Sequence, residues 1–350
     1  MFRVGKKYSI VKRQVALQTK NQFNKMKPIY SLTLLSLIFL FSCKKDDPKP
    51  GEKQENPSFN RKLMYYSVDD SSLYAIDENG NNRIRLCYIE QIYTNTFKYS
   101  KSTNKILYIS KQGVLSNMVQ VYTSNPDGTN IIQLTNNNLE KHGATFSTDG
   151  SKVLIYSYSL TSDSLGKFIM MNSDGNNKTS IPFPSNISKY WGYNPDFSAN
   201  DSMFIFAGYV IFQDSSRKEG LFRINTDGTN LTQILDSTLI PDYPQISPDG
   251  SKIAFVGYEN RNYNIFTIDL NGTNLNKLTN FTFTFGHNIF TELPSWSEDG
   301  SKIAFASNFN RPDLSTEPDK YYEIYVMDKN GSNITQLTND TLYQNSPVWR

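Results

Sequence analysis

The feature that most constrains this chain is a phrase that recurs about every fifty residues. Its second half is a turn dipeptide between two apolar segments, present in six copies: Asn79-Gly80, Asp127-Gly128, Asp174-Gly175, Asp227-Gly228, Asn271-Gly272 and Asn330-Gly331. Gly supplies the positive φ that a tight hairpin needs, and Asp or Asn tolerates it. We therefore expect six hairpins, each joining a third strand to a fourth.

The first half of the phrase predicts a second set of turns, between strand one and strand two. It reads Ser-x-Asp-Gly-Ser-Lys, with intact copies at three serines and altered copies at two more: Ser147, Ser247, Ser297, Ser100 and Ser198. An aromatic or apolar residue precedes each of these turns, and Trp349 repeats that residue near the end of the chain. The last copy therefore supplies a first strand with no turn after it.

A fixed period with four strand-sized segments per unit is typical of a β-propeller, because one such sheet cannot cover both of its faces. Residues 62–87 supply second, third and fourth strands without a first one. We predict an all-β fold over residues 61–350: a six-bladed β-propeller of four-stranded antiparallel blades. The closing blade is shared by both termini, with Pro347–Arg350 as its inner strand.

The first sixty residues have a different character. Residues 29–41 are uncharged and follow Lys25 and Lys27, but they are shorter than the ~20 residues that cross a bilayer. This pattern predicts a signal peptide over residues 26–42. Residues 1–25 are then a start assigned too far upstream or a long n-region, and the charged, proline-containing residues 43–60 are expected to form an unfolded tether.

The end of the signal segment, Leu40-Phe41-Ser42-Cys43, resembles a bacterial lipobox. The run Lys44-Lys45-Asp46-Asp47 is similar to the export signal of surface lipoproteins in the Bacteroidota. These resemblances imply that Cys43 is acylated and becomes the mature N-terminus. They imply anchorage to the outer membrane through this lipid, at the cell surface or, alternatively, on the periplasmic face.

Charge and cysteine usage narrow the classes of function. Residues 61–350 hold 24 Lys and Arg against 29 Asp and Glu, a net charge of about −5, which disfavours a nucleic-acid partner. With Cys43 acylated, Cys87 is the single remaining thiol, so no intramolecular disulfide is expected. We interpret Cys87 as a small apolar residue of an outer strand.

The inventory for catalysis and metal binding is poor. His142 and His287, each expected in a connection between blades, have no second ligand at metal spacing, so we predict no metal, cofactor or catalytic residue. Nucleophile-elbow and phosphate-loop motifs are absent from the sequence. The patterns at Asp269–Asn274 and Asp328–Asn333 suggest calcium, but they lack the full ligand set, and hairpin turns are the favoured interpretation.

The phrases Asp-Gly-Ser-Lys-Ile-Ala-Phe and Asn-Gly-Ser-Asn-x-x-Gln-Leu-Thr resemble the propeller repeats of the TolB family, across residues 61–350. The resemblance implies the fold but leaves the function open, because such repeats serve periplasmic scaffolds, peptidase accessory domains and polysaccharide lyases. We favour a monomeric binding or scaffold module for a protein or glycan partner.

The partner is expected on the face that carries the longer connections, because loops on a rigid scaffold carry recognition. The candidate partner-binding residues are Arg217, Lys218, Arg261, Arg311 and His287. Trp191, expected at a junction between blades, is interpreted as a core residue. The alternative is a carbohydrate-active enzyme, a lyase or glycosidase, that uses loop carboxylates such as Glu219, Glu292 or Glu317.

Overall fold

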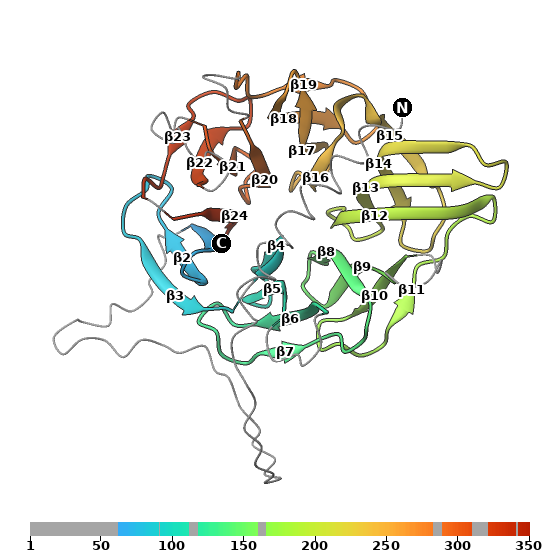
Figure 1. The fold of residues 1–350 in the computed structure, drawn as a ribbon, viewed down its shortest axis with the longest axis horizontal. Coiled ribbons are helices and arrows are strands. Elements are labelled where there is room, and N and C mark those ends of the chain that lie inside the picture. Colours follow the sequence, from blue (N-terminus) through green and yellow to red (C-terminus); the bar gives the residue numbers. More distant parts are fainter. Residues whose placement is uncertain are drawn as a thin grey trace, which may run out of the picture. The chain divides into compact units, whose positions relative to one another are not determined.

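The structure is a computed structural model that describes residues 62–90, 92–111, 118–159, 166–282, 289–309, 321–340 and 342–350, with the backbone alone for residues 93–96. These residues form six four-stranded antiparallel sheets arranged as the blades of a β-propeller (Figure 1). The predicted fold class is therefore confirmed. Within the described ranges, no helix is long and apolar enough to span a bilayer.

Blades 2 to 6 each contain four consecutive strands, ordered from the inner strand to the outer one. Blades 2 and 3 comprise β4 (Ile92–Ser100), β5 (Lys105–Ser110), β6 (Gln120–Ser124), β7 (Ile132–Gln133), β8 (Glu140–Phe146), β9 (Lys152–Tyr158), β10 (Lys167–Asn172) and β11 (Thr179–Ser180). Blades 4 to 6 comprise β12 (Ile187–Phe197), β13 (Met203–Phe212), β14 (Arg217–Asn225), β15 (Thr232–Asp236), β16 (Asp242–Ile246), β17 (Lys252–Glu259), β18 (Asn262–Asp269), β19 (Asn276–Lys277), β20 (Thr291–Trp296), β21 (Lys302–Ser307), β22 (Glu323–Asp328) and β23 (Thr335–Gln336). A short 3-10 turn, η2 (Ser237–Leu239), joins blades 4 and 5.

Blade 1 closes the ring with strands from both ends of the described chain. Its order is β24 (Gln344–Trp349), β1 (Leu63–Ser67), β2 (Ser72–Ile76) and β3 (Ile84–Tyr88) (Figure 1). The shared closing blade is confirmed, and its inner strand begins at Gln344, three residues before the predicted start. The indole nitrogen of Trp349 donates to the Ser295 carbonyl of blade 6 at 2.9 Å, which ties the two blades together.

The hydrophobic core lies between the blades rather than inside any one of them. The second strands β9 and β17 are buried on both faces, as their apolar runs predict. One cluster, for example, packs Ile205 and Leu221 of blade 4 against Phe255 of blade 5. Cys87 is 2% exposed in β3, in agreement with its predicted structural role.

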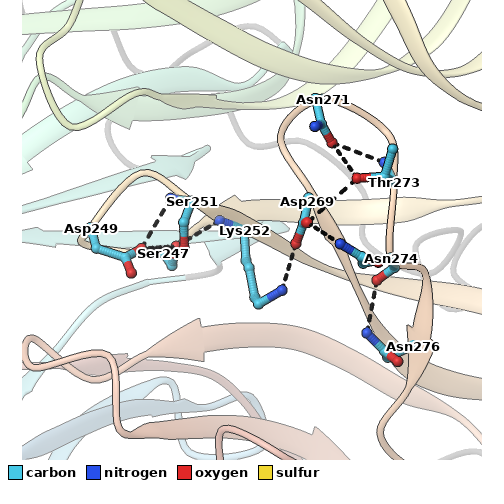
Figure 2. Close-up of polar contacts among 9 residues, drawn as sticks. All are labelled: Ser247, Asp249, Ser251, Lys252, Asp269, Asn271, Thr273, Asn274 and Asn276. Carbon is cyan, nitrogen blue, oxygen red and sulfur yellow. Dashed lines mark hydrogen bonds and ion pairs between the residues drawn. The ribbon is translucent and has the colours of Figure 1, made fainter.

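The repeated phrase forms two kinds of turn, both seen in blade 5 (Figure 2). Between strands one and two, Asp249 Oδ1 accepts from the Ser247 hydroxyl at 2.6 Å and from the Ser251 N–H at 3.0 Å. The same contacts recur around Asp149 and Asp299. These hydrogen bonds hold the pKa of each of the three carboxyls below its usual range, that of Asp299 at about 2.

The calcium-like pattern at Asp269–Asn274 is a hairpin turn, as the favoured interpretation predicts. Asn271 Oδ1 accepts from the Thr273 N–H at 3.0 Å, which closes the turn (Figure 2). The Asp269 carboxylate accepts from the Lys252 ammonium at 2.5 Å and from the Asn274 amide at 2.6 Å. Its oxygens thus bind protein donors. Among the described residues, no group of three or more His, Cys, Asp or Glu could hold a metal ion.

The turn glycine of one blade packs against the Leu-Thr end of the repeat in the preceding blade. A Cβ added to Gly331 would lie 2.3 Å from the carbonyl oxygen of Leu278, in the preceding blade. A Cβ on Gly80 would likewise lie 2.7 Å from the carbonyl oxygen of Leu337. These leucines belong to the Leu-Thr ends of the repeat, so the turn glycine is needed for blade packing as well as for its positive φ.

Candidate functional site

The turns of the propeller lie on two faces with different character. Because adjacent strands are antiparallel, the one–two and three–four turns share one face, here called the turn face. The two–three turns and the connections between blades share the opposite face, here called the loop face. Each inner strand therefore runs from the loop face to the turn face.

A bulge interrupts the inner strand in blades 3 to 6 and in the closing blade. At the bulge one residue has a positive φ, in the order Gly143 (105°), Asn194 (50°), Tyr243 (50°), Leu293 (55°) and Ser346 (53°). Proline follows this residue in four of the five strands, and the pairing register with the second strand shifts at the same place. Such bulges bend a strand and redirect its side chains.

The bulges narrow the central channel to a waist. All six inner strands contribute to its lining, with Phe97, Ala144, Pro195, Pro244, Pro294 and Pro347. The cavity at this depth has a volume of about 30 Å³, which is room for at least one water molecule.

The residue directly before each bulge lies on the loop-face side of the waist. These five positions, here called the mouth ring, carry His142, Tyr193, Asp242, Glu292 and Asn345. The turn face repeats the same residues from blade to blade, whereas the mouth ring differs in every described blade. Because this position varies from blade to blade while the turns repeat, we take these five residues as the candidate functional site.

Two carboxyl groups are neighbours in this ring. Asp242 Oδ1 accepts from the Asn194 amide at 2.8 Å and from the Tyr243 N–H at 2.7 Å, which fixes its orientation. Glu292 is half-buried. Burial, with a smaller contribution from the charge of Asp242, raises the pKa of Glu292 to about 7.

Tyr343, next to the ring, is affected by the charge of Glu292. Burial, and then the charge of Glu292, raises the pKa of Tyr343 well above its usual range. The backbone N–H of Tyr343 donates to Asp69 at 2.7 Å, which holds this segment against blade 1. Tyr343 therefore lies close to Glu292, just before the closing strand β24.

His142 lies in an inner strand, so its predicted place in a connection between blades is wrong. Strand β8 begins at Glu140, before the histidine, because pairing with the second strand already includes Lys141, which lies opposite Ser157. Lys141 is also fully buried. The His142 Nε2 and the Tyr158 hydroxyl are 3.1 Å apart. The imidazole thus belongs to the mouth ring, where we see no second histidine in the described ranges.

Trp191 is also in an inner strand, β12, and not at a junction between blades as predicted. Its ring centroid lies 4.2 Å from that of Tyr158 and 5.8 Å from that of His142. The side chain is partly buried and packs against the core cluster of blades 3 and 4. Its predicted role as a core residue agrees with this packing.

Arg217 and Lys218 were expected among the longer connections of the loop face, but they lie in a strand. Strands β13 and β14 continue as a hairpin to residues 213–216, so both cations lie in β14. The Arg217 guanidinium is 4.0 Å from the Tyr209 ring centroid and pairs with Glu219 at 2.8 Å. The aromatic and apolar residues of β13 favour a strand that extends beyond the blade, so the sequence contained a signal for this hairpin.

Arg261 was also expected among the longer connections, but it lies in a two-residue turn between β17 and β18. Glu259 and Asn262 pair directly on either side of this turn. Asn260 and Arg261 have φ values of 48° and 69°, the left-handed pair that such a hairpin requires. Arg261 is exposed at the tip of the turn.

The remaining predicted site residues are not brought together by the described part of the structure. His287, Arg311, Glu317 and Cys43 lie outside the described residues. Glu219 is half-exposed in the hairpin of blade 4, whereas Glu292 is in the inner strand of blade 6, so they form no carboxyl pair.

Asp242 was not predicted as a neighbour of Glu292. A signal does exist, because four of the inner strands place a proline two residues before the aromatic or apolar residue that ends the strand, as in Pro244 before Ile246 and Pro294 before Trp296. Aligning these four blades on their prolines also aligns Asp242 with Glu292.

Comparisons with known proteins agree with this architecture. Residues 204–350 match the TolB beta propeller domain, PD40. The fold is similar to TolB from Acinetobacter baumannii, with a TM-score of 0.61 and 17% identity over 83% of this chain and 67% of that chain. Putative TolB from Agrobacterium tumefaciens gives a TM-score of 0.57 and 16% identity over 81% of this chain and 90% of that chain.

A chain of a nidogen/laminin complex gives a TM-score of 0.57 at 9% identity, over 82% of this chain and 97% of that chain. No curated protein matches the chain in sequence. At these identities the structural likeness shows the fold alone. The chain is therefore a six-bladed β-propeller whose residues 204–350 match the TolB beta propeller domain.

Proposed function

We propose that the protein is a membrane-anchored lipoprotein whose β-propeller binds a protein or glycan partner through the loop face. The contrast between the two faces carries this proposal. On the turn face, the carboxylates of Asp149, Asp249 and Asp299 accept hydrogen bonds within their own turns. On the loop face, the side chains differ from blade to blade, as a recognition surface requires.

The hairpin of blade 4 supports the same assignment. The last pair between β14 and the fourth strand is Gly220 with Asp236, so Arg217–Glu219 extend past β15. Arg217 stacks on Tyr209, and the Lys218 ammonium lies 5.7 Å from the Phe212 ring centroid. Exposed cations supported by aromatic rings are common in protein interfaces.

The anchor and the location are inferred from sequence. Residues 26–43 carry the signal-peptide and lipobox features, and the net charge of about −5 over residues 61–350 disfavours nucleic acid. A propeller on an unfolded tether would sit at the outer membrane with one broad face available to a partner. We place it at the cell surface, with the periplasmic face as the alternative.

Site-specific photo-crosslinking in intact cells tests the binding face. A photoreactive residue replaces Lys218 on the loop face or, as the matched control, Glu298 on the turn face. Both positions are exposed, so both replacements should leave the fold intact. We expect a discrete crosslinked product from position 218 alone. Crosslinks from position 298 alone would assign the partner to the opposite face.

A second candidate function, a carbohydrate-active enzyme, is favoured by one observation. Glu292 and Asp242 are neighbouring carboxyls, and a pKa of about 7 suits Glu292 to act as a general acid. A panel of polysaccharides incubated with the wild type and with Glu292→Gln tests it. New reducing or unsaturated ends with the wild type alone would support catalysis, and unchanged glycans with both proteins would contradict it.

A further inference from the structure

The turn-face end of the channel opens into a polar cavity that the proposed function does not use. This turn-face cavity has a volume of about 210 Å³, with Lys98, Asp196 and Gln245 at its floor and Ser102 and Thr148 at its rim. We propose that it binds the carboxylate of a small hydroxylated acid the size of one sugar ring. Pockets for drug-sized ligands measure ~300–1,000 Å³, so the occupant is smaller than these. The site is independent of a partner on the loop face.

The floor of the turn-face cavity holds an ammonium that a ligand can reach. Lys98 Nζ of blade 2 lies 3.5 Å from Asp196 Oδ1 of blade 4. The Thr145 hydroxyl and the Ile246 N–H, from blades 3 and 5, donate to the same carboxylate at 3.2 and 2.9 Å. Protein donors thus occupy both oxygens of Asp196. Within the described structure Lys98 has no other partner, and its side chain is 24% exposed, so protons of its ammonium remain for a ligand.

A second donor on the floor comes from blade 5. Gln245 is half-buried and lines both the waist and the turn-face cavity. Its Oε1 accepts from the Trp296 N–H of blade 6 at 2.9 Å, which leaves the amide nitrogen without an acceptor among the described residues. The next residue, Ile246, is the one that donates to Asp196, so the amide and the ammonium are held around one carboxylate. Two donors with no free acceptor beside them favour a ligand carboxylate, which only accepts.

The rim of the turn-face cavity offers hydroxyl oxygens, which suit the rest of such a ligand. Ser102 and Thr148 are exposed in the one–two turns of blades 2 and 3. The Ser102 hydroxyl donates to the Thr148 carbonyl at 3.5 Å, and the Thr148 hydroxyl donates to Asp201 at 3.0 Å. Each hydroxyl oxygen keeps lone pairs that accept from a hydroxyl group of the ligand. The floor therefore fits an anionic acceptor and the rim fits hydroxyl donors.

The charge of the lining also favours an anion. Among the charged residues that line the turn-face cavity, two are cations, Lys98 and Lys101, and one is an anion, Asp196. Lys101 pairs with Glu298 of blade 6 at 2.5 Å, but both side chains are more than half exposed, where such a pair is weak. An excess of one positive charge attracts a carboxylate and repels an ammonium.

Saturation-transfer NMR on the full chain in detergent micelles tests this assignment. The probes share one ring and differ in charge: D-glucuronate, neutral D-glucose and cationic D-glucosamine. We expect saturable transfer with glucuronate alone. Gln245→Glu keeps an oxygen for the Trp296 N–H but replaces the free amide with a negative charge, so it should weaken glucuronate binding by about tenfold or more. Gln213→Glu, the same change in the exposed turn of the blade 4 hairpin, should bind as the wild type does.

Three results would overturn the assignment: no transfer to glucuronate, equal binding of glucose or glucosamine, or wild-type binding by Gln245→Glu. Circular dichroism verifies that the Gln245→Glu variant is folded. Should it not fold, Lys98→Met carries the same expectation, because it removes the ammonium from the floor. Lys167→Met, at the exposed start of β10, is its matched control and should bind glucuronate normally.

Discussion

At the scale of single residues, the most constrained polar side chain is Lys141. It has no exposed surface, and its ammonium donates to Asn137 Oδ1 at 2.7 Å, to the Leu139 carbonyl at 2.5 Å and to Gln120 Oε1 at 3.2 Å. Burial lowers its pKa to about 8. Because Gln120 belongs to blade 2 and Lys141 to blade 3, this one side chain fastens two blades together.

Replacing Lys141 with Met should destabilise the protein by about 1–3 kcal/mol, because the oxygens around the ammonium lose their donor in a buried place. Urea unfolding followed by circular dichroism measures the change. Lys167→Met, at the exposed start of β10, is the control and should stay within about ±0.5 kcal/mol of the wild type. Equal losses for the two variants would contradict the assigned role.

Glu292 makes the stability depend on pH in a definite direction. Its pKa is about 7 in the folded protein and 4.5 in an unperturbed chain, so between these values the folded state keeps a proton that the unfolded state releases. Rising pH therefore favours unfolding across this window. Glu292→Gln cannot titrate, and its advantage over the wild type should grow from near zero at about pH 4.5 to its full value above about pH 7.

Melting temperatures of the wild type and Glu292→Gln across this pH range provide the measurement. Glu219→Gln is the matched control on the exposed hairpin, and its melting curves should follow the wild type. A constant difference between Glu292→Gln and the wild type at every pH would show that the buried carboxyl does not titrate in this window.

At the scale of strands and turns, local chemistry was enough to predict the hairpins. The dipeptide Asn330-Gly331, for example, determines its turn by the φ that glycine allows. The ends of β8 and β14 depend instead on pairing with neighbouring strands, which a short sequence window does not contain. The fold was therefore predictable, whereas the strand ends that determine the places of His142 and Arg217 required the three-dimensional pairing.

Removing Pro347–Arg350 should open the propeller, because these residues pair with β1 and join the chain's two ends in one sheet. We expect a lower melting temperature, a less cooperative transition and a tendency to aggregate through the exposed edge. Differential scanning calorimetry and light scattering would measure this. Trp349→Phe is the milder control, since it removes one hydrogen bond to Ser295 but keeps the strand. An unchanged transition in the truncated protein would contradict closure through β24.

At the scale of the whole molecule, the propeller has two unlike faces. The turn face is stabilised by repeated local hydrogen bonds, such as those of Asp249, and the loop face by strands and connections that differ among blades. Sequence suggested this division of roles, but it misplaced His142 and Arg217, because strand ends are determined by pairing with neighbouring strands.

Cys43→Ser should release the protein from the membrane fraction or stall its export, because the proposed lipid attaches to the cysteine sulfur. Fractionation of cells and intact-mass measurement of the purified protein would show it. Cys87→Ser is the matched control, because its buried thiol lies in the propeller and its loss should leave the protein in the membrane. An unmodified N-terminus upstream of residue 43 would rule out the anchor.

The inner-strand bulges have a consequence for how this protein could diversify. Their shape is determined by backbone torsions and, in four strands, by a following proline, and not by the side chain just before them. His142, Tyr193, Asp242 and Glu292 therefore occupy equivalent positions although no two of these side chains are the same. Each could be exchanged without redesigning its blade. The side chains of the ring can therefore vary independently while the backbone of the bulges stays the same. Related chains could acquire new ligands one blade at a time.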